Sequence, residues 1–188
     1  MPTYVAMLRG INVGSGKIVK MERLRASFGA LGFGGVRTYV QSGNVIFESE
    51  QKSAAGLSNK IEEKIQGDFG FRVPVLLKTS KEIEQIVSDN PLVKKKGVDH
   101  SKLHVTFLSD APPNAAVKAL EPLATDRERL RILNREIYLY CPDGYGRTKL
   151  SNTAIEKKLS VVATTRNWRT VNTLLEMCRS SRVIDSLE

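Results

Sequence analysis

The first eighty residues alternate between short β-rich runs and segments with helical spacing, and this order constrains the fold more than any other feature. Aliphatic side chains recur every three or four residues in two helical segments, and β-branched or aromatic residues dominate the runs around them. The runs cover residues 3–8, 36–40, 45–47 and 73–77, with helical spacing over 21–31 and 57–65. This β-α-β-β-α-β order is the split βαβ pattern of ferredoxin-like folds.

The second half of the chain repeats most of this order. A strand is predicted over residues 102–108, and Pro112 and Pro113 open a helix after it. Two runs at 130–133 and 137–140 form a strand pair. A helix then begins near Ser151, and residues 164–169 open a last helix. The sequence therefore predicts an α+β protein with two ferredoxin-like βαββα halves in tandem and an additional C-terminal helix.

A polar stretch separates these halves. Ser80 is the expected N-cap of a helix that ends before Asn90-Pro91, since a residue that precedes proline disfavours helical backbone. Three lysines and a glycine follow at residues 94–97. We expect an N-terminal βαββαβ subdomain over 1–79, a connecting helix and linker over 80–100, and a C-terminal βαββα subdomain with its final helix over 101–188.

The basic residues are concentrated towards the C-terminal end. The formal net charge is +9, and between Gly144 and Arg182 eight basic residues accompany only two acidic ones. Such a surface attracts anions, including nucleic acid and phosphorylated small molecules. A charged face whose role is solubility remains the alternative.

Several classes of protein are disfavoured. No apolar run approaches the length of a membrane helix, and the N-terminal residues do not resemble a signal peptide, so we expect a cytoplasmic protein with no membrane partner. The two cysteines, Cys141 and Cys178, form no CxxC motif. His100 and His104 lie in or beside a predicted strand, where four residues span roughly 13 Å. We therefore expect no metal site and no cofactor.

The glycine-rich loop over residues 9–20 is the first candidate binding segment. Glycines let backbone N–H groups approach a phosphate, and a predicted helix begins just downstream. It is not a Walker A loop, because five residues separate Gly10 from Gly16 and Ile18 occupies the position of the metal-binding hydroxyl. Its candidate anion-binding residues are Arg9, Asn12, Lys17 and Lys20. A mobile turn is the alternative.

Two further segments combine cations with an aromatic residue. The first covers residues 143–152 and joins a strand to a helix, and the second covers 164–169. Ser151 or Asn152 is also suited to capping that helix. Tyr145 and Trp168 are candidates for stacking on a base, although helical spacing also favours Trp168 as a core residue. The candidate anion-binding residues here are Arg147, Lys149, Arg166 and Arg169.

Three of these motifs together resemble a bacterial domain-of-unknown-function family, the one numbered sixteen ninety-seven. They are Leu8-Arg9-Gly10-Ile11-Asn12-Val13-Gly14, Gln41-Ser42-Gly43-Asn44-Val45 and Thr165-Arg166-Asn167-Trp168. The likeness covers nearly the whole chain. It implies two α+β subdomains in a free-standing bacterial cytoplasmic protein, and it brings no activity and no catalytic residues.

Three hypotheses for the function remain open. The first is that an anionic ligand, either nucleic acid or a phosphorylated small molecule, binds in a basic cleft between the halves. The second is an enzyme for a small anionic substrate, in which Arg9 and Arg166 hold the ligand and Tyr145 or Ser42 assists proton transfer. The third is a protein-interaction module, which an exposed apolar patch or an unpaired edge strand would favour. The oligomeric state and any catalytic residue stay undetermined.

Overall fold

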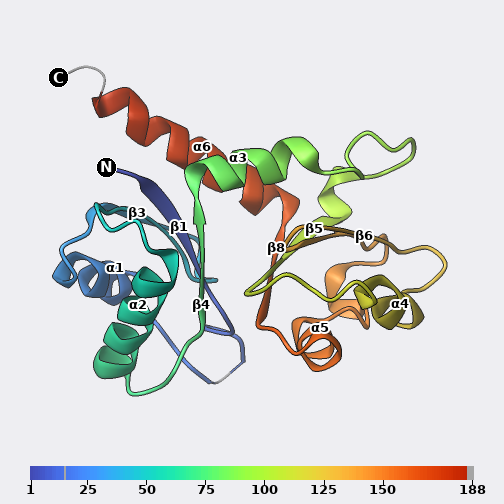
Figure 1. The fold of residues 1–188 in the computed structure, drawn as a ribbon, viewed down its shortest axis with the longest axis horizontal. Helices are drawn as coiled ribbons and strands as arrows, with labels where there is room; N and C mark the ends of the chain where they lie inside the picture. The colour runs from blue at the N-terminus through green and yellow to red at the C-terminus, as the bar shows by residue number, and fades with distance from the viewer. Residues whose placement is uncertain (15, 186–188) are drawn as a thin grey trace. The chain divides into compact units, whose positions relative to one another are not determined.

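The computed structural model describes residues 1–14 and 16–185, with only the backbone described for residues 181–185. Ser15 of the glycine-rich loop and the side chain of Arg182 in the basic stretch thus lie outside the described part. Within it, the chain is a mixed α+β structure with six α-helices and two four-stranded antiparallel sheets (Figure 1). It forms two compact units, one made of Met1–Glu84 with Thr173–Glu188 and the other of Gln85–Asn172.

The first unit contains a sheet with the strand order β2-β3-β1-β4. Its elements are β1 (Thr3–Leu8), α1 (Met21–Ala30), β2 (Gly34–Tyr39), β3 (Asn44–Glu48), α2 (Ala54–Phe69) and β4 (Val75–Thr79). β1 pairs with β3 and with β4 in antiparallel register. β4 is an edge strand and starts directly after Pro74, a residue that has no backbone N–H to donate and therefore suits a strand start or a sheet edge.

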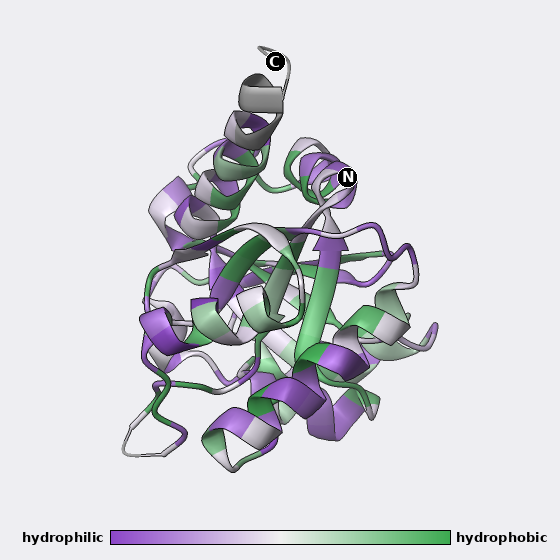
Figure 2. Cartoon of the chain, turned by 90° about the vertical axis from the view of Figure 1, so that its left-hand side faces the viewer, coloured by the Kyte–Doolittle hydropathy of each residue, from purple (hydrophilic) through white to green (hydrophobic). Residues whose placement is uncertain are grey.

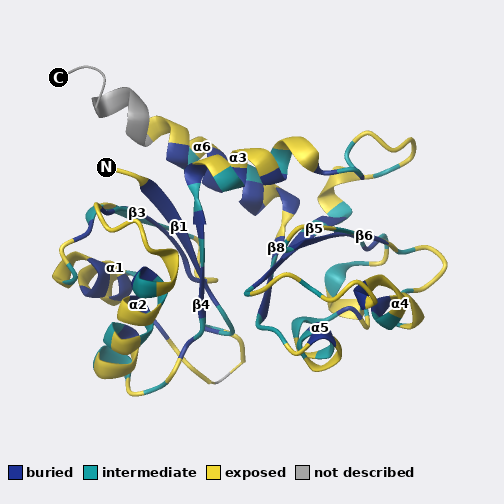
Figure 3. Ribbon diagram, viewed as in Figure 1, coloured by how far each residue is buried: buried dark blue, intermediate teal, exposed yellow. Residues whose placement is uncertain are grey.

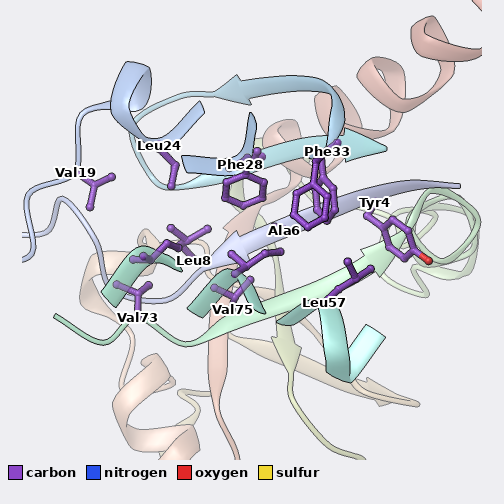
Figure 4. Close-up of a cluster of buried hydrophobic side chains, with 14 of the residues drawn as sticks. Tyr4, Ala6, Leu8, Val19, Leu24, Phe28, Phe33, Leu57, Val73 and Val75 are labelled. Atoms are coloured by element: carbon purple, nitrogen blue, oxygen red, sulfur yellow. The ribbon is translucent and has the colours of Figure 1, made fainter. Parts of the chain in front are cut away.

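Helices α1 and α2 pack on one face of the sheet. Alternate residues of β1, including Tyr4 and Leu8, contribute to a buried cluster with Leu24 and Phe28 of α1 and Leu57 of α2. Figure 4 shows this cluster, with Leu24 near one end and Tyr4 near the other. Every second residue of β1 and the apolar stripes of the helices therefore share one core, and Val5 and Met7 on the other face of β1 are buried as well.

The second unit repeats this topology, with the strand order β6-β7-β5-β8. Its elements are β5 (Leu103–Leu108), α4 (Ala116–Leu120), β6 (Arg129–Leu133), β7 (Glu136–Tyr140), α5 (Asn152–Leu159) and β8 (Ala163–Asn167). The chain enters this unit within α3 (Ser80–Asp89) and leaves it within α6 (Trp168–Asp185). Leu108, Ile137 and Ile155 belong to its core cluster.

The structure corrects two sequence predictions. Residues 163–167 form strand β8 where we expected the start of the last helix, so the second unit has the full β-α-β-β-α-β order. β5 provides the backbone partners for β8, and this pairing overrides the local pattern. The cap of α3 is Thr79 instead of Ser80. The Glu82 N–H donates to Thr79 Oγ1 at 3.2 Å and the Thr79 N–H donates to Glu82 Oε2 at 2.7 Å, which is a capping box.

The strands and the inward faces of the helices hold most of the buried residues, and the outward faces of the helices are exposed (Figure 3). Figure 2 shows the same contrast, with hydrophobic colour along strands and hydrophilic residues on the helices that face the viewer. None of the helices in the described part combines the length and apolar character needed to cross a membrane.

Candidate functional site

Two segments that are distant in sequence meet at one end of the first sheet. We call them the loop pair, and they comprise residues 9–20 and the turn at residues 40–43. The Leu8 N–H donates to the Gly43 carbonyl at 2.9 Å. Gly43 has φ +79°, and a Cβ placed there would lie 2.7 Å from Ile11 Cδ1 and 2.8 Å from Leu8 Cβ. Only glycine fits this position, so the turn packs directly on the loop.

Asn12 ties the loop pair together through its carboxamide. Its Nδ2 donates to the carbonyl of Val19 at 2.9 Å and to that of Gln41 at 2.7 Å. Its Oδ1 accepts from the Val19 N–H at 2.8 Å. The Asn12 N–H donates to the Lys17 carbonyl at 3.1 Å, and this bond joins the two sides of the loop. The sequence suggested Asn12 as an anion-binding residue, whereas the structure shows these side-chain atoms engaged with the backbone.

The surface of the loop pair carries both cations and aliphatic side chains. Lys17 and Lys20 are exposed, and Lys17 Nζ donates to the Arg72 carbonyl at 2.7 Å. Arg9 is half-buried. Three aliphatic side chains are strongly exposed, with exposed fractions of 74% for Val13, 57% for Ile18 and 49% for Val40.

The backbone of this region is strained at a β-branched residue. Val40 has φ +51°, a conformation that costs a β-branched residue about 1–3 kcal/mol. Asn12 and Lys17 also have positive φ, at 53° and 44°. Buried Ile11 and Val19 fix the base of the loop in the core. Packing and hydrogen bonds therefore fix the base of the loop pair.

The second unit presents a basic segment, residues 143–159, that joins β7 to β8. It includes a 3₁₀ turn at Tyr145–Arg147 and helix α5. Ser151 Oγ accepts from the Ala154 N–H at 3.2 Å, which confirms the predicted cap. Gly144 has φ +95° where the chain turns into this segment.

A network of hydroxyl groups anchors the basic segment to the sheet. Tyr145 OH donates to Thr165 Oγ1 at 3.0 Å, and Thr165 Oγ1 donates to Asn152 Oδ1 at 2.6 Å. Thr106 Oγ1 lies 2.7 Å from Thr165 Oγ1. Since Thr165 gives its proton to Asn152, Thr106 must be the donor in that pair. Three of these residues come from the sheet or the helix, so the 3₁₀ turn is fixed at Tyr145.

His104 of β5 completes this arrangement. Its ring stacks on Tyr145 with centroids 5.0 Å apart and an interplanar angle of 27°. Burial lowers the pKa of His104 below its usual 6.5, an effect partly offset by a hydrogen bond to the Lys102 carbonyl. The imidazole is therefore neutral at neutral pH.

Four exposed cations extend along the basic segment: Arg147, Lys149, Lys157 and Lys158. Among the described residues, none of their side chains takes part in a hydrogen bond or ion pair. Glu156 lies between them in sequence, but its Oε1 accepts from the Ala163 N–H at 3.0 Å. The sequence pointed to Arg147 and Lys149. It gave no signal for Thr106 and Thr165, because their pairing depends on the strand β8 that the sequence did not reveal.

The remaining candidates occupy different environments. Arg166 is only 7% exposed, and its guanidinium donates to Thr164 Oγ1 at 2.8 Å and to the Thr165 carbonyl at 3.0 Å. Trp168 is 8% exposed at the start of α6, so a base reaches its ring only if the side chain leaves the core. Arg169 is exposed.

The described residues offer little to a metal or to thiol chemistry. No group of three or more His, Cys, Asp or Glu side chains in the described part is arranged to hold a metal ion. Both cysteines are buried, and neither forms a disulfide within the described residues. Burial raises the pKa of Cys141 to about 12, so its thiolate is scarcely populated at neutral pH.

Comparisons with known proteins agree with the fold and add no activity. The model of a family described as "Protein of unknown function (DUF1697)" matches residues 1–138. No curated protein matches the sequence. A solved structure of the conserved bacterial protein SP0830 from Streptococcus pneumoniae is similar, with a TM-score of 0.74 and 22% identity over 94% of this chain and 98% of that one. At this identity the likeness extends to the fold.

Proposed function

This chain belongs to the DUF1697 family of proteins of unknown function, which brings no activity with it, and we propose from its own surface that the second unit binds a polyanion. The observation that carries this proposal is the set of four exposed cations on the basic segment, whose side chains have no hydrogen-bond or ion-pair partner among the described residues. Each cation that contacts a phosphate releases condensed counterions from the ligand, which favours binding.

The anchoring of the segment supports the same function. The hydroxyl network around Thr165 holds Tyr145 in place, and Arg147 follows only two residues later. Cations on a fixed backbone lose less conformational entropy on binding than cations on a mobile loop. The network therefore makes each phosphate contact more favourable.

The extent of the cations favours a ligand with repeated charge over a single phosphate. Arg147 and Lys149 precede α5, and Lys157 and Lys158 lie in its last turn. Eight residues of α-helix span roughly 12 Å, so one compact phosphate does not contact both ends. A nucleic-acid backbone, with its closely spaced phosphates, is the ligand that fits best.

Binding of a fluorescent single-stranded oligonucleotide across a salt series tests this proposal. The double variant Arg147→Gln, Lys149→Gln should lower the affinity and reduce the slope of log K against log salt by about 1.4, or about 0.7 for each lost contact with a single strand. The matched control is Lys94→Gln, Lys118→Gln, which removes two exposed cations from the same unit outside the basic segment.

Equal slopes for both double variants would refute the assignment of the basic segment. Saturable binding of a phosphorylated metabolite, with no binding of the oligonucleotide, would favour the alternative of a small anionic ligand.

We also propose that each unit is ferredoxin-like. The strand orders β2-β3-β1-β4 and β6-β7-β5-β8, antiparallel throughout, support this assignment.

A further inference from the structure

We propose that the loop pair of the first unit is a docking surface for an acidic peptide segment that carries aliphatic side chains. This surface is separate from the basic segment of the second unit, and its function does not depend on polyanion binding. The proposal rests on three features: exposed aliphatic residues on two adjoining segments, a fixed base, and the two exposed lysines beside Ile18.

The three exposed aliphatic residues lie beside backbone groups that the Asn12 side chain joins. Val13 directly follows Asn12, Ile18 directly precedes Val19, and Val40 directly precedes Gln41. The Asn12 carboxamide donates to the carbonyls of Val19 and Gln41. Each aliphatic residue is therefore the sequence neighbour of Asn12 or of a residue that is hydrogen-bonded to it. Half of the exposed large hydrophobic residues in the described part of the chain thus lie on these two hydrogen-bonded segments. Clustered exposed aliphatic groups are typical of interaction sites.

The base of this surface is fixed before any partner binds. The Leu8 N–H donates to the Gly43 carbonyl and the Arg9 N–H to the Pro74 carbonyl, each at 2.9 Å. The lack of space for a Cβ at Gly43 locks the turn against the loop. A partner therefore pays little for ordering this backbone, as expected of a pre-organised binding surface.

The charge of the loop pair indicates the chemistry of its partner. Residues 9–20 contain three basic and no acidic side chains, and residues 40–43 are uncharged. Lys17 and Lys20 flank Ile18, so the aliphatic cluster has a cationic rim. Carboxylates placed around an aliphatic anchor complement this arrangement.

Two other occupants fit less well. A second copy of this chain, bound through the same patch, would place Lys17 and Lys20 opposite their own counterparts, and like charges repel. Nucleic acid would satisfy the lysines, but its backbone gives Val13, Ile18 and Val40 no apolar partner. An acidic segment with aliphatic side chains satisfies both parts of the surface.

Fluorescence anisotropy with three labelled amphipathic peptides tests the proposal on the full chain. The first peptide carries leucines and glutamates, the second leucines and lysines, and the third glutamates with serines in place of the leucines. We expect saturable binding of the first peptide alone. The variant Val13→Ser, Ile18→Ser should weaken this binding by at least about tenfold, because the aliphatic burial is lost.

Matched variants separate the surface from general effects. Val117→Ser removes another exposed aliphatic side chain, from the second unit, and should leave the affinity unchanged. Lys20→Glu should weaken binding about three- to fivefold, whereas Lys52→Glu, at another exposed lysine of the first unit, should not. The Arg147→Gln, Lys149→Gln variant should bind the peptide normally, which distinguishes this proposal from the polyanion site.

Three results would overturn the inference. They are the absence of saturable binding by the leucine–glutamate peptide, equal binding of all three peptides, and an unchanged affinity in the Val13→Ser, Ile18→Ser variant. Displacement of the bound peptide by an oligonucleotide would assign this surface to nucleic acid instead.

Discussion

Replacement of Gly43 by alanine should strongly destabilise the first unit, and the structure supplies the size of the effect. Alanine at φ +79° carries the penalty of left-handed backbone, about 1–2 kcal/mol. Its Cβ would also lie 2.7 Å from Ile11 Cδ1 and 2.8 Å from Leu8 Cβ, and overpacking of this kind costs about 1–3 kcal/mol. Together these costs predict a loss of about 2–5 kcal/mol in the free energy of unfolding.

Urea unfolding followed by circular dichroism measures this loss against a matched control. Gly29 lies in the last turn of α1, and a Cβ there meets nothing within 4 Å. Gly29→Ala should therefore raise the free energy of unfolding by up to about 1 kcal/mol, through helix propensity. A Gly43→Ala variant as stable as the wild-type protein would show that the turn does not pack on the loop as described. The same result would remove the fixed base on which the docking surface depends.

Two further predictions concern titratable groups. Because burial lowers the pKa of His104 below 6.5, the folded protein disfavours the imidazolium. The contribution of His104 to the free energy of unfolding should be fully present above the unfolded pKa and should decline as the pH falls from 6.5 towards the lower folded pKa. Urea midpoints of the wild-type protein and a His104→Gln variant, measured across this pH range, check whether the decline depends on His104. Cys141, whose pKa is raised to about 12, should not react with a thiol reagent at neutral pH in the folded protein and should react only after unfolding in urea. Rapid labelling of Cys141 in the native protein would contradict its burial.

Much of the fold is encoded in local sequence patterns. The strands of both units other than β8 follow from runs of β-branched and aromatic residues, and helices such as α2 follow from the spacing of their buried residues. The cap at Ser151 could also be predicted from the sequence, because Ser151 accepts a hydrogen bond from an N–H only three residues away. These features depend on neighbours within a few residues.

Strand β8 could not be identified in the same way. Residues 163–167 contain two threonines but also Arg166 and Asn167, and their pattern is equally suited to the start of a helix. What makes them a strand is antiparallel pairing with β5, such as Thr165 with Thr106. That partner lies 59 residues away. Tertiary pairing thus decided a local conformation that propensity left open.

The candidate sites also have features that the sequence predicts and features that only the tertiary structure shows. The sequence by itself identified the glycine-rich loop and the cations of residues 147–149, because residue type and order suffice for this. Only the tertiary structure showed that Asn12 bonds across 29 residues to Gln41, or that Thr165 joins Tyr145 to Asn152. The physical reason is that charge and turn preference are properties of each residue, whereas exposure and hydrogen-bond partners are set by segments that meet only in the folded chain.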